Sequence, residues 1–220
     1  MYKLDNVKGM LGAITNGVFQ VITLEGTGIN TMSDLKGKNI AMGGAGGGTI
    51  NVANDLWNVL YGFGVDDINA TYSSYTDAAS NLGDGKVDAV IWQTSAPAPA
   101  IAELMAGKGE SVKIIGLTDE EIQKVCETYP YYARYEVTPE VYGMKEGAAT
   151  ICLNNILVCR ADLEDGLVYD MVKTLVENFA AVNEAYPGTK LFKPETAVST
   201  IPIDIHPGAM QYFKDAGLAK

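Results

Sequence analysis

The sequence predicts an α/β protein with two lobes, and two observations support this fold class. Short apolar runs alternate along the chain with segments in which apolar residues recur at helical spacing, a pattern typical of α/β folds. Two of the apolar runs, residues 17–24 and 149–159, enclose a complete alternating set of strands and helices. A chain that leaves one lobe, builds another and returns crosses twice, so we expect two lobes with a ligand cleft between them.

The segment that starts with the first run supplies most of the predicted elements. Strands are expected over residues 17–24, 39–42, 70–73, 87–92 and 112–117, because each is a short apolar run bounded by turn-forming residues. Helices are expected over residues 49–60, 77–82, 97–105 and 119–127. The first of these helices has one apolar face, formed by Ile50, Ala53, Trp57 and Leu60. A single helical turn is expected between Ser33 and Gly37.

The C-terminal part of the chain is predicted to contain one long strand, residues 149–159, and one long helix, residues 168–185. The helix has an apolar stripe formed by Val168, Met171, Val172, Leu175, Phe179 and Val182. Asn154 and Asn155 interrupt the apolar strand, in which successive side chains alternate in direction. One of these amides must therefore face the core or the cleft, and Asn154 is a candidate ligand contact.

The composition limits the classes of function. The 220 residues include 27 acidic and 16 basic side chains, which give a formal charge of −11. Such a field does not attract nucleic acid or an anionic membrane surface. An anionic small molecule would need local donors, such as backbone N–H groups, hydroxyls or arginine. No apolar stretch approaches the ~20 residues needed to cross a membrane.

Side chains suited to catalysis or metal binding do not occur in a recognisable pattern. His206 is the only histidine, and no nucleophile motif accompanies it. Cys126, Cys152 and Cys159 have neither a paired nor a metal-ligand spacing, so we interpret them as buried apolar residues. The sequence therefore predicts no catalytic residue, no metal site, no cofactor and no enzymatic activity.

The strongest local signal is a glycine-rich loop between a predicted strand and a predicted helix. Residues 43–49 contain five glycines, including Gly46, Gly47 and Gly48, and end in Thr49. Glycine lets backbone N–H groups approach a ligand closely, and a helix N-terminus favours an anion. The dinucleotide and Walker fingerprints both fail at specific positions. The loop thus indicates a small-anion site, with a tight strand-to-helix turn that binds nothing as the alternative.

A second polar loop follows the strand at residues 87–92. Gln93, Thr94 and Ser95 provide an amide and two hydroxyls, and Pro97 opens the next helix. Ligands of open α/β sheets lie outside the carboxyl ends of the strands. We therefore expect the two loops to bind one ligand together.

A tyrosine-rich segment supplies two further candidates, Arg134 and Tyr135. In one interpretation this segment only packs between the lobes. In the other, Arg134 or a tyrosine hydroxyl reaches the ligand.

Four segments resemble those of a known family. Residues 32–43 (MSDLKGKNIAMG) and 44–49 (GAGGGT) resemble the DLKGK segment and the glycine loop of solute-binding proteins. Residues 88–92 (DAVIW) with Pro97, and residues 201–213 (IPIDIHPGAMQYF), are similar to two further signatures. On these motifs the chain resembles TAXI-type solute-binding proteins, the receptor subunits of TRAP transporters. Gly47 stands where that family usually has serine.

The resemblance implies a two-lobed fold of the periplasmic-binding-protein type II kind and a periplasmic or other extracytoplasmic location. It implies capture of a small organic anion, either a dicarboxylate or an acidic amino acid such as glutamate. It also implies docking on the membrane subunits of a TRAP transporter. The alternatives are a cytoplasmic ligand-sensing domain of the same fold and a nucleotide-dependent enzyme.

The resemblance further implies that the first lobe lacks its N-terminal part, and the first residues do not read as a signal peptide. Residues 1–25 with 150–220 would form this incomplete lobe, and residues 26–149 a complete second lobe, joined by two hinge strands. An incomplete lobe exposes strand edges and apolar stripes. We therefore expect this form to make a homodimer or to exchange elements between copies.

Overall fold

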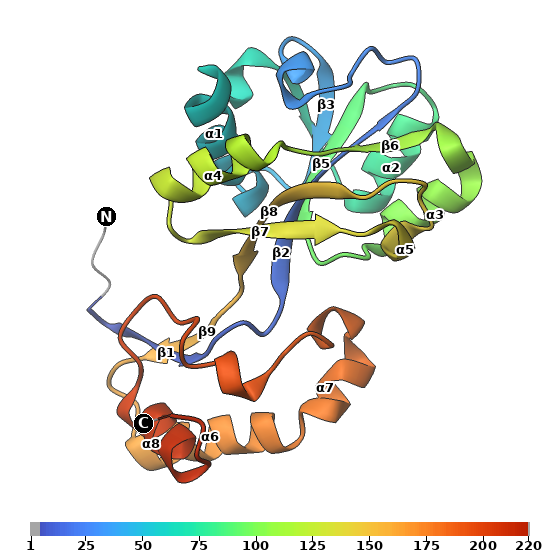
Figure 1. Ribbon diagram of the computed structural model, residues 1–220. Coiled ribbons are helices and arrows are strands. Elements are labelled where there is room, and N and C mark those ends of the chain that lie inside the picture. Colours follow the sequence, from blue (N-terminus) through green and yellow to red (C-terminus); the bar gives the residue numbers. More distant parts are fainter. Residues whose placement is uncertain (1–4, 220) are drawn as a thin grey trace. The chain divides into compact units, whose positions relative to one another are not determined.

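The structure, a computed structural model, describes residues 5–219 and divides the chain into two compact units (Figure 1). Unit 1 consists of Met1–Asn16 and Asn154–Lys220, and unit 2 consists of Gly17–Leu153. Each unit contains both strands and helices. The α/β class and the division into two lobes are therefore confirmed. None of the helices in the described part of the chain is long and apolar enough to cross a membrane.

Unit 2 is built on a seven-stranded sheet with the order β4-β3-β5-β2-β8-β7, and β6 also pairs with β2. The strands are β2 (Asn16–Leu24), β3 (Asn39–Met42), β4 (Asn69–Tyr72), β5 (Ala89–Thr94), β6 (Val112–Ile115), β7 (Tyr132–Val137) and β8 (Ala148–Asn154). β3 lies parallel to β4 and β5, whereas β2 lies antiparallel to β5 and β6. The long central β2 thus connects the parallel and antiparallel parts of the sheet.

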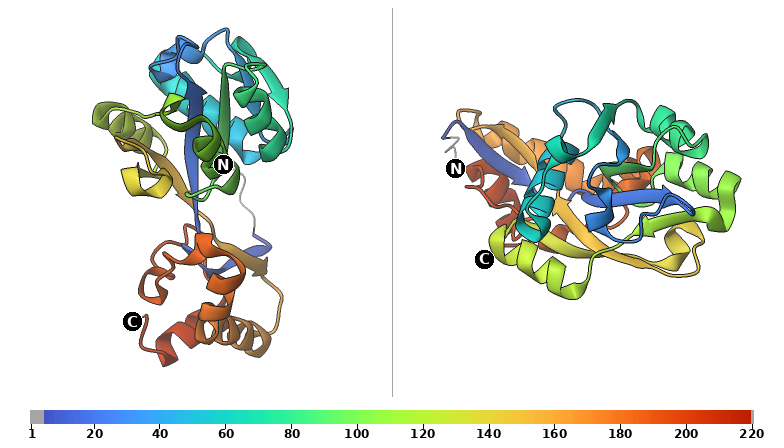
Figure 2. Two further views of the ribbon diagram at one scale, coloured as in Figure 1. Left: turned by 90° about the vertical axis from the view of Figure 1, so that its right-hand side faces the viewer. Right: turned by 90° about the horizontal axis from the view of Figure 1, so that it is seen from above.

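Both faces of this sheet are covered by helices. Alternate residues of β2 enter two separate apolar clusters, Phe19 and Val21 in one and Val18 and Ile22 in the other. The first cluster includes side chains of α1 (Gly48–Tyr61) and α4 (Asp119–Thr128). The second includes side chains of α2 (Tyr75–Gly83), α3 (Pro99–Lys108) and α5 (Pro139–Tyr142). Figures 1 and 2 show these two sets of helices on opposite sides of β2.

Local signals set the ends of the helices in unit 2. Thr118 Oγ1 accepts a hydrogen bond from Glu121 N at 3.2 Å, and Glu121 Oε2 accepts one from Thr118 N at 2.9 Å. This reciprocal capping box fixes the start of α4. Gly62, with φ of 70°, ends α1 in the left-handed conformation that glycine adopts without strain. Single turns of 3-10 helix lie at Met32–Leu35, Val65–Asp67 and Gly109–Ser111.

Unit 1 has a smaller sheet in which β1 (Val7–Leu11) and β9 (Leu157–Arg160) pair antiparallel. Its helices are α6 (Asp165–Glu177), α7 (Phe179–Ala185) and α8 (Pro207–Asp215), with 3-10 turns at Pro187–Thr189 and Pro194–Thr196. They surround one apolar cluster, in which Met10, Leu11 and Phe213 are buried. A Cβ at Gly208 would overlap the backbone oxygen of Asp165. Glycine at this position therefore lets the start of α8 lie directly against α6.

The expected lobe boundaries, at residues 25/26 and 149/150, are displaced from the observed ones. The chain passes between the units after Asn16 and after Leu153. All of β2 from Val18 onwards pairs with β5 or β6, and β8 pairs with β7 as far as Leu153. Because these ladders hold both strands within one sheet, each belongs to unit 2 over almost its whole length.

Two long elements of the sequence prediction are each divided in the structure. The strand expected over residues 149–159 ends as β8 at Asn154 and resumes as β9 at Leu157. Asn155 between them bonds Thr15 twice, through its backbone N at 2.9 Å and its amide Nδ2 at 2.6 Å. The helix expected over residues 168–185 breaks at Asn178, whose Nδ2 donates to Thr174 O at 2.9 Å. In both places an asparagine side chain bonds neighbouring groups where the regular element stops.

Candidate functional site

The glycine-rich loop joins the buried end of β3 to the first turn of α1, as the sequence predicts. Gly46 has φ of 77°, a conformation in the left-handed region that favours glycine. A Cβ at Gly47 would lie 2.9 Å from Gly44 O, which accepts a hydrogen bond from Gly47 N. The turn therefore requires glycine at these positions for its own shape. Gly48, the first residue of α1, is exposed, and the first-turn N–H groups of a helix have no acceptor within it.

The two loops predicted from the sequence are in direct contact. Thr49 is buried, and its Oγ1 accepts a hydrogen bond from Gln93 N at 3.3 Å. A Cβ at Gly48 would lie 3.2 Å from Gln93 Oε1. The structure thus brings Gly48, Thr49 and Gln93 together at the carboxyl ends of β3 and β5. Because β3 and β5 are parallel, both chain segments turn at the same end of the sheet.

A buried polar network holds the second loop in place. Tyr142 donates from its hydroxyl to Gln20 Oε1 at 2.6 Å and accepts at the same oxygen from Ala98 N at 2.8 Å. Gln20 Nε2 donates to Thr94 O at 3.3 Å. Burial raises the pKa of Tyr142 to about 12, so the hydroxyl stays protonated and can donate. The network binds the loop at both ends, before and after Ser95 and Pro97.

Tyr75 is a neighbour of the glycine loop that sequence reasoning missed. Its ring packs against Trp92 with 4.9 Å between ring centroids. A Cβ at Gly43 would lie 3.1 Å from its Cε1 atom. Tyr75 is the first residue of α2, which follows β4. In the sheet, β4 is the neighbour of β3. Its place after a third strand could have identified Tyr75 from the sequence. In the same way, the polar Gln20 within a mostly apolar strand could have indicated the buried network.

Three residues predicted to contact the ligand lie apart from the glycine loop and have other neighbours. Arg134 lies on β7 and bonds Asp119 Oδ1 at 3.1 Å and Glu136 Oε2 at 2.9 Å. Tyr135, the next residue of the same strand, packs against the apolar cluster on the other face. Asn154 is exposed at the end of β8. None of the three has a contact with the glycine loop among the interactions found in residues 5–219.

Most of the chain also matches a protein family. The model of the NMT1-like family matches residues 3–217. The chain belongs to the NMT1-like family.

Solved structures to which the NMT1-like chain is similar include three solute-binding proteins. The arginine-, lysine-, histidine-binding protein of Geobacillus stearothermophilus is 17% identical over 86% of this chain and 65% of its own, with a TM-score of 0.43. An ancestral arginine-binding protein is 14% identical over 83% and 63%, with a TM-score of 0.45. The periplasmic aliphatic sulphonate binding protein of Escherichia coli is 15% identical over 84% and 47%, with a TM-score of 0.39. The NMT1-like chain thus spans less than two thirds of the length of these proteins.

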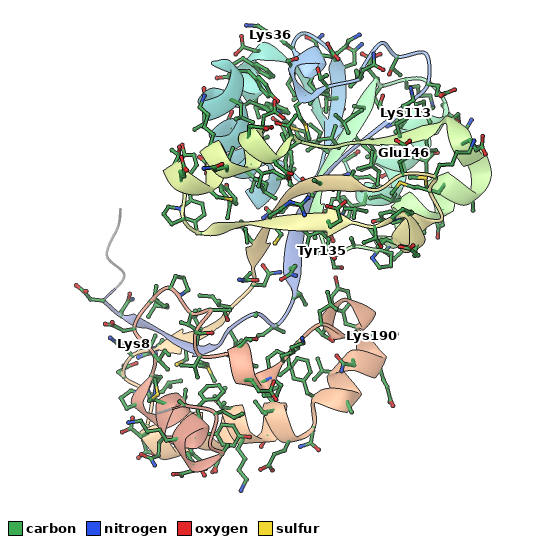
Figure 3. All side chains as sticks on the ribbon, in the orientation of Figure 1. Lys8, Lys36, Lys113, Tyr135, Glu146 and Lys190 are labelled. Atoms are coloured by element: carbon green, nitrogen blue, oxygen red, sulfur yellow. The ribbon has the colours of Figure 1, made fainter. Side chains whose placement is uncertain are left out.

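The ion pairs and hydrogen bonds of the basic side chains in unit 2 show which groups could stabilise an anion at the two loops. The basic side chains of unit 2 with an assigned polar contact bond groups elsewhere: Lys36 bonds Asp67, Lys38 bonds Thr27 O, Lys86 bonds Asp84, Lys113 bonds Glu25, Lys145 bonds Glu110 and Arg134 bonds Asp119. In Figure 3, Lys36 lies at the opposite end of unit 2 from Tyr135. Any negative charge at the loops would be stabilised chiefly by backbone N–H groups and the α1 N-terminus.

The described cysteines and possible metal ligands do not form a redox or metal site. Cys126, Cys152 and Cys159 are free thiols, of which only Cys152 is buried, whereas burial of all three was expected. Burial raises the pKa of Cys152 to about 11, which disfavours the reactive thiolate. Among residues 5–219 there is no group of three or more His, Cys, Asp or Glu side chains placed to hold a metal ion. His206 Nδ1 accepts from Gly208 N at 3.2 Å and so caps α8.

Proposed function

We propose that this chain binds a small organic anion at the joined loops of unit 2, and releases it chemically unchanged. The observation that carries the proposal is the contact between Thr49 Oγ1 and Gln93 N, which fixes two donor-rich strand ends to each other. Preorganised donors bind without the cost of ordering them, and rigid elements hold them more precisely than free loops.

A carboxylate is the ligand group that fits these donors. Gly48, the exposed first residue of α1, offers its N–H group at the positive end of the helix, and the loop glycines allow close approach. The Thr49 hydroxyl and the Gln93 amide add neutral hydrogen-bond donors. We infer that the ligand is a dicarboxylate or an acidic amino acid such as glutamate, with one carboxylate at the α1 N-terminus.

The setting that best explains such a site is solute transport. Membership of the NMT1-like family and the TAXI-like motifs of the sequence support an extracytoplasmic receptor that delivers its ligand to membrane subunits of a TRAP transporter. Retention of the chain on vesicles that contain such subunits, with release when the ligand is omitted, would test this part of the proposal. Binding without any such delivery would leave the transport role unsupported.

The ligand site is tested by calorimetric titration with C4 and C5 dicarboxylates, glutamate and neutral amino acids. We expect one anion class to bind, and Thr49→Ala to weaken it by about 0.5–1.5 kcal/mol, the contribution of one ordinary hydrogen bond. Thr49→Ser keeps the hydroxyl and should bind nearly as the parent does. Thr128→Ala, which removes an exposed hydroxyl on α4, is the matched control. Absence of binding by every compound, or equal affinity of the alanine variant at position 49, would contradict the proposal.

The absence of catalysis is tested on the same samples. Mass spectrometry of the ligand after prolonged incubation should find it unaltered. Conversion of the ligand at a rate that follows protein concentration would show an enzyme instead.

A further inference from the structure

A second feature of unit 2, unrelated to the glycine loop, is a groove along the outer edge of β6. Its volume is about 820 Å³. It is bordered by β6, by the C-terminal part of α3, and by α5 with the loop that follows it. Figure 3 labels two of its lining residues, Lys113 on β6 and Glu146 on the segment after α5. The glycine loop and Gln93 are not among its lining residues.

The strand that borders this groove has unused backbone hydrogen-bonding groups. Glu25 N donates to Ser111 O at 2.7 Å, so these residues form a hydrogen-bonded pair of the antiparallel ladder. By alternation, Lys113 and Ile115 also exchange bonds with β2. The N–H and C=O of Ile114 therefore point away from β2. In the described chain β6 pairs only with β2, so the outward groups of Ile114 have no strand to bond.

The groove combines this edge with an apolar floor and an acidic rim. Apolar lining is given by Met105, Ile114, Val141, Tyr142 and Met144. Four acidic side chains, Glu25, Glu110, Glu140 and Glu146, and two basic ones, Lys113 and Lys145, also line it, a balance of −2. Both lysines are already paired, Lys113 with Glu25 at 3.7 Å and Lys145 with Glu110 at 2.7 Å. The remaining charge on the rim is therefore negative.

We propose that this groove receives an extended basic peptide segment of a partner protein, which adds to the sheet as a strand beside β6. Strand addition uses the backbone groups of an open edge for affinity and side-chain contacts for specificity. Lysine or arginine side chains of the segment would meet the Glu146 side of the rim, and its apolar side chains would pack on the floor. A second copy of this chain is disfavoured as the occupant, because each copy carries a charge of −11.

The proposal is tested on the full chain with fluorescent peptides about six residues long, an ordinary strand length. One peptide alternates lysine with valine, a second alternates glutamate with valine, and a third is the lysine peptide with alternate backbone nitrogens methylated. We expect anisotropy to detect binding of the first at low salt. The other two should bind at least about tenfold more weakly, through charge repulsion and loss of strand hydrogen bonds respectively.

Variants locate the binding to the groove. Glu146→Lys should weaken the lysine peptide about fivefold, whereas Glu184→Lys, the same charge change at an exposed position of α7 in unit 1, should leave it within about twofold. Ile114→Pro removes the outward N–H without removing a bond to β2 and should abolish binding.

Three results would overturn the proposal: equal binding of the methylated peptide, equal effects of the two glutamate variants, or no binding of any peptide at millimolar concentration. Self-association that Ile114→Pro removes would identify a second copy as the occupant and would overturn it as well. Thermal unfolding of each variant separates loss of binding from loss of the fold.

Discussion

The two units bury their apolar residues to different degrees. In unit 2 a seven-stranded sheet is covered on both faces, and Trp57 and Trp92 are completely buried. In unit 1 two strands and three helices enclose one cluster, while Leu191 remains 66% exposed and Leu167 49% exposed. A two-stranded ladder is marginal without further strands or helix packing. In this chain the unit with more paired strands buries its large apolar side chains more completely.

The helix α6 shows the same contrast at the level of single residues. Val168 and Val172 are buried against the unit 1 cluster, but Met171, from the same predicted stripe, is 39% exposed. The stripe expected from the sequence is therefore only partly covered within unit 1. Dimerisation or exchange of elements through this surface stays a prediction, which light scattering of the purified chain would test.

The largest expected difference is in autonomous folding. We expect residues 17–153, expressed alone, to unfold cooperatively, because both apolar clusters of the sheet lie within that segment. Residues 5–16 joined by a short linker to residues 154–219 should show no cooperative transition. Urea unfolding followed by circular dichroism is the measurement. The expected difference between the units would be contradicted if the linked unit 1 piece unfolded cooperatively, or if residues 17–153 did not.

Gly208→Ala should destabilise unit 1 selectively, by about 3 kcal/mol or more, because the added methyl overlaps the Asp165 backbone and neither backbone can move freely. Gly166→Ala is the matched control in the same unit, since a Cβ there meets nothing within 4 Å and helical alanine is favoured over glycine. Native-state hydrogen exchange should lose protection in α6 and α8 while β2 and β5 keep theirs. Uniform loss over both units would show that they unfold together.

Tyr142→Phe should destabilise unit 2 by about 1–3 kcal/mol, because Gln20 Oε1 and Ala98 N both lose their buried partner. The same variant should also loosen the loop between Gln93 and Ala98 and weaken ligand binding. Chemical denaturation and calorimetry check the two effects. Tyr72→Phe, at an exposed position of β4 in the same unit, serves as the control. Unchanged stability would mean that the network does not hold the loop.

The smallest expected effect is a dependence of unit 2 stability on alkaline pH. Burial raises the pKa of Tyr142 to about 12, whereas a phenol in the unfolded chain ionises near pH 10. The unfolded state therefore loses its proton first, so stability is complete below about pH 10 and falls as pH rises toward 12. Denaturation midpoints measured between pH 8 and 11 should show this slope. Tyr142→Phe should reduce it without removing it, because the pKa values of Tyr61, Tyr131 and Tyr132 in the same unit are also raised. An equal slope in both proteins would assign the effect to other groups.

Periodicity and local turn chemistry predicted the α/β class, the strand over residues 39–42, a helix over residues 49–60 that the structure extends to Gly48–Tyr61, and the glycine loop between them. These features depend on neighbours along the chain, so the sequence determines them. Tertiary structure alone decided that Thr49 meets Gln93, that Gln20 and Tyr142 hold the second loop, and that Arg134 pairs with Asp119. It also divided the strand at Asn155, whose amide bonds the distant Thr15. The physical reason is that such contacts join residues distant in sequence, and their free energy depends on strand pairing that local patterns do not encode.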